Sequence, residues 1–297
     1  MSTDLICRAA IGDRCGEAAT WSADERALYW CDVLRFLIHR YDWDSGSVRS
    51  WVFDEPVVAM SLTSRPGTLL VALASRLIFW EPQTDARTPH GFELESSPRV
   101  RFNDGRADPL GNFWVGTMKN NVEPDGELGT VGPGEGILFR VAPDGTVREA
   151  VHELGIANTL CWSPDRRYFY FADTLANEIR RYDYDATRGL IANPEPFLFG
   201  MKLGVPDGSA MDAEGYLWNC RFGGGCVLRV SPEGRIVRTL EMPVPNVTTC
   251  AFGGPDLKTL FITTAGRPHV RGDRLAGSLF SLEVPVPGLP ENLFRIE

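Results

Sequence analysis

FWVGT at residues 113–117 is a short run of aromatic and small or β-branched residues, and it directly follows the turn-forming run DPLGN at residues 108–112. Aromatic and β-branched residues favour strands, whereas Asp, Pro, Gly and Asn favour the tight turns that connect strands. A similar strand, usually after such a turn, occurs six times along the chain, as LYWCD, LVALA, FWVGT, FYFAD, LWNCR and LFITT. These strands begin near residues 28, 69, 113, 169, 217 and 260. The mean step of about 46 residues is typical of four-stranded propeller blades.

Each repeated strand is followed by further runs with strand character. A second run follows each of them: FLIHRYD, RLIFWEP, GILFRVAPDG, NEIRRYDYD, CVLRVSPEG and GSLFSLEV. Alternation with a period of two indicates strands, and the sequence contains no convincing amphipathic helix of three or more turns. The sequence therefore predicts an all-β fold, a six-bladed β-propeller that forms a single domain over residues 1–297. The N-terminal run LICRAAI is expected to pair with the C-terminal blade and so close the ring.

Composition argues against several classes of partner and site. The formal net charge of the 297 residues is −9 and no basic run stands out, which argues against binding to nucleic acid or to an anionic membrane surface. No apolar run approaches the roughly 18 residues needed to cross a bilayer, and the first residues lack the pattern of a secretory signal. We therefore expect a cytoplasmic protein, either a monomer or a weak homo-oligomer.

The cysteines and histidines predict neither disulfides nor a zinc site. The seven cysteines include no C-x-x-C pair, so reduced and mostly buried thiols are expected. The four histidines show no H-E-x-x-H spacing, and no G-x-S-x-G occurs. A histidine-built zinc site and a Ser-His-Asp hydrolase are therefore poorly supported.

Polar residues recur at one position of the predicted repeat. Ten or eleven residues before each repeated strand, the innermost strand of a blade is expected to line the central channel. The residues at this position are Glu17, Val58, Asn103, Asn158, Asp207 and Thr249. Two carboxylates and two carboxamides should therefore converge at one mouth of the channel.

Two interpretations of these channel residues remain open. Polar residues in a channel can bind water and one another, and that alternative needs no ligand. Carboxylate and amide oxygens are also the ligands that hard divalent cations prefer, and a cation would remove the repulsion between two neighbouring carboxylates. The position of Asn103 favours a functional role for the surrounding Asn-Asp-Gly stretch over a plain hairpin turn.

Five motifs in the same order carry a resemblance that covers nearly the whole chain. They are CGEAATW, RFNDGRADPLGNFWVGTM, ANTLCWSPD with its following YFADT, PDGSAMDAEGYLW and FGGPDLKTLFITTA. With these motifs the sequence resembles the senescence marker protein (regucalcin)/gluconolactonase family, whose members are six-bladed propellers. The resemblance implies hydrolysis of a sugar lactone, an aldonolactone, to the aldonic acid.

The resemblance also implies roles for particular residues. One divalent cation in the channel (Ca²⁺, Zn²⁺, Mn²⁺, Mg²⁺ or Fe²⁺) would be held by Glu17, Asn158 and Asp207, with Asp207 also acting as the catalytic general base. Arg101, Asn103 and Asn121 would bind the substrate.

The sequence departs from the family pattern at several positions. Ala18 and Ala19 stand where the family has Gly-Pro, and Thr159 stands where it has Gly. Some relatives carry an acidic substrate-binding residue shortly after Gly-Thr-Met, whereas this chain has Asn120 and Asn121 there, with Glu123 a little later. Arg221, where relatives often have an aromatic residue, is either a solvated loop arginine or a substrate contact.

Two alternative functions share the predicted scaffold. The first is a phosphotriesterase-like hydrolase, which an apolar channel mouth would favour, whereas the polar pair Arg101 and Asn103 favours a hydroxylated substrate. The second is a non-enzymatic binding protein, either a non-catalytic calcium-binding propeller or an interaction propeller. A pure protein that is metal-free and inert toward lactones would support a non-enzymatic role.

Overall fold

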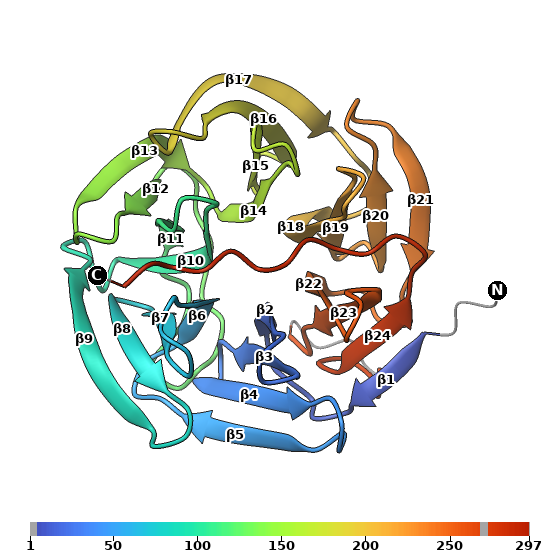
Figure 1. The fold of residues 1–297 in the computed structure, drawn as a ribbon, viewed down its shortest axis with the longest axis horizontal. Coiled ribbons are helices and arrows are strands. Elements are labelled where there is room, and N and C mark those ends of the chain that lie inside the picture. Colours follow the sequence, from blue (N-terminus) through green and yellow to red (C-terminus); the bar gives the residue numbers. More distant parts are fainter. Residues whose placement is uncertain (1–4, 268–272, 297) are drawn as a thin grey trace.

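Six small antiparallel sheets arranged in a ring make up the computed structural model, which describes residues 5–267 and 273–296 (Figure 1). Every sheet has four strands, in line with the predicted all-β, six-bladed propeller. The described part of the chain contains no helix, and hence none that could span a bilayer.

In blades 1–5 the four strands follow one another in the chain, from the channel outward, whereas the outermost strand of blade 6 comes from the N-terminus. Blade 1 contains β2 (Gly16–Ser22), β3 (Ala27–Asp32), β4 (Leu37–Asp42) and β5 (Val48–Val52), and blade 2 contains β6 (Val57–Leu62), β7 (Leu69–Leu73), β8 (Arg76–Glu81) and β9 (Ala86–Glu93). Blade 3 contains β10 (Val100–Ala107), β11 (Phe113–Lys119), β12 (Gly136–Val141) and β13 (Val147–Leu154), and blade 4 contains β14 (Ala157–Trp162), β15 (Tyr168–Asp173), β16 (Glu178–Asp185) and β17 (Leu190–Phe199). Blade 5 contains β18 (Val205–Met211), β19 (Leu217–Phe222), β20 (Cys226–Val230) and β21 (Ile236–Glu241). Blade 6 contains β22 (Val247–Gly253), β23 (Thr259–Thr264), β24 (Leu279–Glu283) and, from the N-terminus, β1 (Ile6–Ala9).

The predicted repeat and the predicted ring closure are both confirmed. The six repeated runs are the second strands of the blades: β3, β7, β11, β15, β19 and β23. Strand β1 pairs antiparallel with β24, with Cys7 opposite Phe280. The N-terminal strand thus covers the edge of the last sheet, which would otherwise expose unpaired backbone groups.

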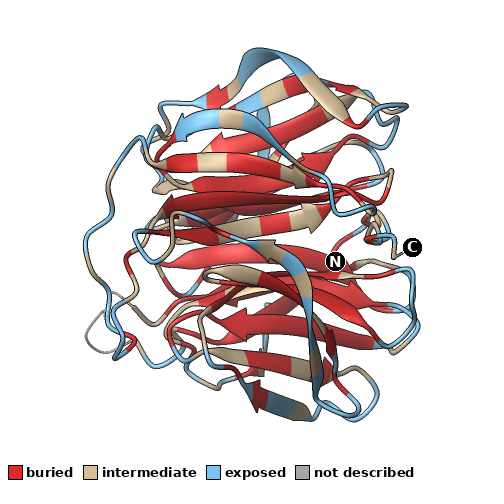
Figure 2. Ribbon diagram, turned by 90° about the vertical axis from the view of Figure 1, so that its left-hand side faces the viewer, coloured by how far each residue is buried: buried red, intermediate tan, exposed pale blue. Residues whose placement is uncertain are grey.

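The turn aspartates of the repeat have a structural role in the core. Buried Asp108 and Asp212 accept hydrogen bonds from the indole Nε1 atoms of Trp114 and Trp218, at 2.9 and 3.0 Å. Each of these buried indole donors therefore has the partner that burial demands. Figure 2 shows the buried strands through the middle of the molecule and the exposed outer strands and loops.

The cysteines agree with the predicted reduced thiols. All seven are free, five of them are buried, Cys15 is half-buried and Cys7 is exposed.

Every innermost strand contains an irregularity in its pairing. The register shifts lie at Glu17/Thr20, Val57/Ala59, Phe102/Gly105, Asn158/Cys161, Pro206/Ser209 and Val247/Cys250. All six predicted channel positions lie in or directly beside these shifts. Because a bulge redirects the side chains next to it, the shifts determine which polar groups of each blade point toward the centre.

The C-terminal segment crosses the central part of one face of the ring (Figure 1). Gly288 pairs with Asp212 of blade 5, and Phe294 pairs with Thr63 of blade 2. Between them, the carboxylate of Glu291 lies 3.7 Å from Arg106 of β10. Residues 288–294 therefore connect blades on opposite sides of the channel.

Candidate active site

The predicted site residues lie near the starts of the innermost strands. Glu17 is in β2, Arg101 and Asn103 are in β10, Asn158 is in β14 and Asp207 is in β18. Asn121 lies just after the end of β11. Because the six innermost strands surround one channel, these residues face one end of it.

A chain of hydrogen bonds joins four of the predicted residues. Arg101 donates from Nη1 to Asn103 Oδ1 at 2.8 Å, and from Nε and Nη2 to Asn121 Oδ1 at 3.3 and 2.8 Å. Asn103 in turn donates from Nδ2 to Asn158 Oδ1 at 3.1 Å. The structure therefore brings Arg101, Asn103, Asn121 and Asn158 into one network.

The network continues to the strand that carries Asp207. Asn158 donates from Nδ2 to Thr174 Oγ1 at 2.8 Å, and Thr174 donates to the carbonyl oxygen of Pro206 at 2.7 Å. Since Pro206 directly precedes Asp207, the amide of Asn158 and the backbone of Asp207 are held relative to each other.

Three acidic side chains act on one another in the channel. Burial, followed by the negative charges of Asp207 and Asp104, raises the pKa of Glu17 well above its ordinary value. Burial and the charge of Asp104 likewise raise the pKa of Asp207. These carboxyl groups thus lie close enough to disfavour each other's ionisation.

Asp104 is not among the site residues predicted from the sequence. It lies inside the register shift of β10, directly after Asn103. Its backbone neighbour Gly105 donates to Asp104 Oδ1 at 2.8 Å, and burial raises the pKa of the Asp104 carboxyl. The signal was present in the Asn-Asp-Gly stretch, but strict alternation would have directed Asn103 and Asp104 to opposite faces.

The residues that replace the family's glycines have left-handed backbones. Ala18 has a φ of 57° and Thr159 a φ of 54°, a region that glycine adopts without a steric cost. The Thr159 hydroxyl donates to the carbonyl oxygen of Asp207, and Asn219 Nδ2 donates to the same oxygen at 3.2 Å. The bond from Thr159 joins blade 4 to the backbone of Asp207, and the bond from Asn219 of β19 holds the same backbone from within blade 5.

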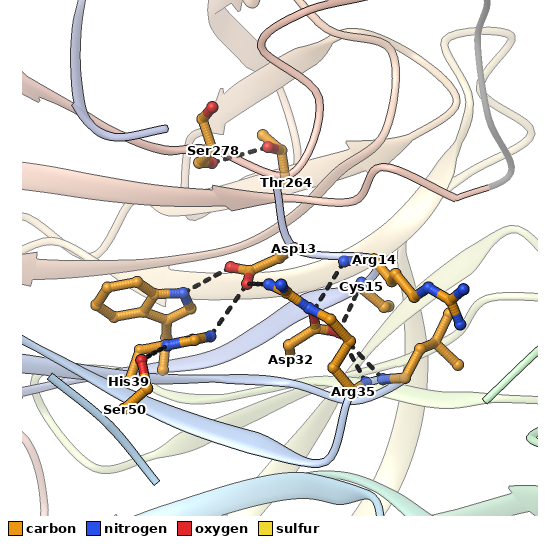
Figure 3. A network of polar contacts seen from close by, with 11 residues as sticks. Asp13, Arg14, Cys15, Asp32, Arg35, His39, Ser50, Thr264 and Ser278 are labelled. Atoms are coloured by element: carbon orange, nitrogen blue, oxygen red, sulfur yellow. Dashed lines mark hydrogen bonds and ion pairs between the residues drawn. The ribbon is translucent and has the colours of Figure 1, made fainter. Parts of the chain in front are cut away.

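A polar cluster around the buried carboxylates of Asp13 and Asp32 holds the segment that leads into Glu17 (Figure 3). The carboxylate of Asp32 accepts hydrogen bonds from the backbone amides of Arg14 and Cys15, at 2.9 and 3.1 Å, and also pairs with Arg35. Asp13 accepts bonds from Trp30 Nε1 at 2.8 Å and Arg35 Nη2 at 2.9 Å. The start of β2 is thus fixed by two buried carboxylates that share the guanidinium of Arg35.

Arg221 is not a solvated loop arginine, because its exposed fraction is only 1%. It donates from Nε to Leu203 O at 2.9 Å and from Nη2 to Gly204 O and Asn177 Oδ1 at 2.7 and 2.9 Å. Nη1 donates to Asn219 Oδ1 at 3.2 Å. Glu123, by contrast, is exposed in the segment after β11.

The side chains predicted to bind the metal carry oxygen donors, which hard cations prefer. Within residues 5–267 and 273–296, no three His, Cys, Asp or Glu side chains are arranged to hold a metal ion. The predicted set has two carboxylates, Glu17 and Asp207, and one amide, Asn158. Oxygen donors of this kind suit divalent cations, and a cation would offset the burial and the repulsion that together raise the pKa of both carboxyl groups.

Six blades thus surround a channel that has acidic and amide groups at one end. A model of the SMP-30/gluconolactonase/LRE-like family matches residues 15–266, and the chain belongs to this family.

The chain resembles named proteins along almost its whole length. It is 35% identical to pentonolactonase XacC of Haloferax volcanii, with 94% of each chain covered, and 35% identical to the 6-deoxy-6-sulfogluconolactonase of Pseudomonas putida, with 99% of each covered. Among solved structures, a calcium-binding protein, regucalcin, from Agrobacterium tumefaciens superimposes with a TM-score of 0.90 at 32% identity, covering 99% of this chain and 98% of the other.

Proposed function

We propose that this chain is a metal-dependent hydrolase that opens a sugar lactone to the aldonic acid. The observation that carries the proposal is the meeting of Glu17, Asp207 and the Arg101–Asn103–Asn158 network at one end of the channel. Relatives named as lactonases, at 35% identity over nearly the full chain, support the same activity.

The metal would be held by Glu17, Asn158 and Asp207. When bound there, a divalent cation would polarise the lactone carbonyl group and stabilise the negative charge that develops on its oxygen. Asn103 contributes by orienting Asn158, because the hydrogen bond from Asn103 Nδ2 fixes the direction of the Asn158 side-chain oxygen.

Asp207 would act as the general base. Its carboxylate would remove a proton from the attacking water as the water adds to the lactone carbonyl carbon. The ring C–O bond would then break, and the protonated Asp207 would return its proton to the alkoxide of the leaving hydroxyl group, which restores the Asp207 carboxylate. Arg101, Asn103 and Asn121 would hold the ring oxygen and hydroxyl groups of the substrate, so that the carbonyl carbon lies within reach of the water.

A pH-stat screen of aldonolactones tests the proposal, because hydrolysis releases one acid equivalent per turnover. Chelated protein and protein reloaded with each of Ca²⁺, Zn²⁺, Mn²⁺, Mg²⁺ and Fe²⁺ are compared. Turnover that is lost on chelation and restored by one ion supports the proposal. Absence of turnover with every reloaded ion contradicts it.

A non-catalytic calcium-binding propeller is the second candidate, favoured by the structural likeness to a protein described as calcium-binding. Tight Ca²⁺ binding without hydrolysis of any lactone would support it. The phosphotriesterase alternative is less well supported, because the residues around Asn103 that would face the substrate are polar or charged.

A further inference from the structure

The partners of Arg101 are all uncharged. Its Nε and one Nη2 hydrogen point to Asn121 Oδ1, and its Nη1 hydrogens point to Phe102 O and Asn103 Oδ1, both at 2.8 Å. No carboxylate of the described residues forms an ion pair with this guanidinium. Arg101 is nevertheless buried, with an exposed fraction of only 6%.

A buried cation without a charged partner is costly, because burial removes its hydration without a compensating charge. Burial accordingly lowers the pKa of Arg101 to about 10, although the negative charge of Glu17 acts in the opposite direction. A guanidinium has five N–H donors, and the four hydrogen bonds leave one Nη2 hydrogen free.

Arg221 adds a second such cation beside Asp207. All four of its acceptors are backbone or amide oxygens. Burial lowers the pKa of Arg221 to about 10, although the negative charge of Asp207 acts in the opposite direction. This guanidinium is enclosed, so it contributes charge to the site without a free surface for a ligand.

The proposed function, on which this step rests, puts a sugar lactone next to Arg101. The Nη2 hydrogen of Arg101 that has no acceptor is then available to the substrate. An anionic group on the substrate would supply the charged partner that this guanidinium lacks among the described residues.

We propose that the substrate carries an anionic substituent, such as a phosphate, sulfonate or carboxylate, away from its lactone carbonyl, and that this group pairs with Arg101. Asn121 determines the preference for an anionic over a neutral substrate, because its uncharged amide oxygen binds the Arg101 guanidinium without cancelling the positive charge. A carboxylate at position 121 would accept the same two hydrogen bonds and neutralise Arg101 directly.

The kinetic test compares glucono-1,5-lactone with its 6-phosphate on the metal-reloaded protein. The expected kcat/KM is at least tenfold higher for the phosphate. Asn121→Glu should reduce that ratio at least tenfold, whereas Asn121→Gln, which stays neutral, should retain it. If Asn121→Glu does not fold, Arg101→Gln removes the same charge and should abolish the preference.

A binding test separates this inference from the proposed function. Calorimetry measures the affinity of 1,5-anhydroglucitol and of its 6-phosphate, which lack the lactone carbonyl and cannot be hydrolysed. The inference is supported if the 6-phosphate binds more tightly than 1,5-anhydroglucitol and if Asn121→Glu abolishes this difference. That result counts even if no lactone is hydrolysed. Equal affinities, or a preference that neither Asn121→Glu nor Arg101→Gln changes, overturn it even if neutral lactones are hydrolysed.

Discussion

Asn103 donates a hydrogen bond from Nδ2 to the side-chain oxygen of Asn158 across 3.1 Å, although 55 positions separate the two residues in the chain. The same amide of Asn103 accepts from Arg101, and the amide of Asn158 donates to Thr174. Neither amide can therefore rotate by half a turn without losing a partner. The bond links the proposed substrate contacts of blade 3 to the proposed metal ligand of blade 4.

Asp207→Asn is expected to lower lactonase turnover by about 10²–10⁴-fold, the usual contribution of a general base. The fold should persist, because the variant removes a buried carboxylate that Asp104 repels. Turnover by pH-stat and melting by circular dichroism check the two parts. Near wild-type turnover would show that Asp207 is not the base.

Removal of the metal should lower the melting temperature as well as stop turnover. A ligand bound only by the native state adds about 2.7 kcal/mol at a hundredfold excess over Kd. Glu17→Gln should weaken the response, because it removes one of the two ligand charges. Calorimetry with and without chelator measures this effect, and a melting temperature unchanged after verified metal removal would argue against a channel cation.

In the absence of metal, the free energy of unfolding of the wild type should decrease relative to that of the Asp207→Asn variant as the pH rises above about 4, the ordinary pKa range of a carboxyl group. The folded state raises the pKa of Asp207, so in this window the folded chain binds more protons than the unfolded chain. Stability then decreases with pH until the raised pKa is passed. Urea unfolding of chelated wild type and variant between pH 4 and about 8 gives the comparison, and parallel curves would contradict it.

Arg101→Ala is expected to raise KM or lower kcat while leaving the metal in place. Arg101 contacts Asn103 and Asn121 but none of the three proposed ligands. Kinetics together with metal content by atomic absorption distinguish the two effects. Loss of the metal would instead identify Arg101 as a structural support of the metal site.

Phe294→Ala should destabilise the fold by about 3–5 kcal/mol, as is usual for a buried aromatic residue. Phe294 is 1% exposed, and its ring centroid lies 5.8 Å from that of His90 and 6.2 Å from that of Phe79. The neighbouring Leu293, 44% exposed, provides the control, and Leu293→Ala should change stability by no more than about 0.5 kcal/mol. Similar values for both variants in urea unfolding would show that the C-terminal segment does not contribute to the core.

Several features of this protein could be predicted from the sequence because they are encoded locally. A turn followed by an alternating strand is recognisable within about ten residues, and its repetition predicts the six blades. Counting along the repeat also located Glu17, Asn103, Asn158 and Asp207 on innermost strands, since each blade begins at the same distance from its repeated strand.

The tertiary structure alone decided which groups meet. The register shift in β10 brings Asp104 close enough to Glu17 and Asp207 for their charges to interact. This departure from strict alternation cannot be predicted from the local sequence pattern. Arg221 is buried through contacts with residues up to 44 positions away in the chain. Asn121, a neutral partner of Arg101, lies 20 positions away, just after the end of β11. Such contacts follow from how the blades pack around the channel, because burial and charge pairing depend on neighbours in space, whereas strand alternation depends on neighbours in the chain.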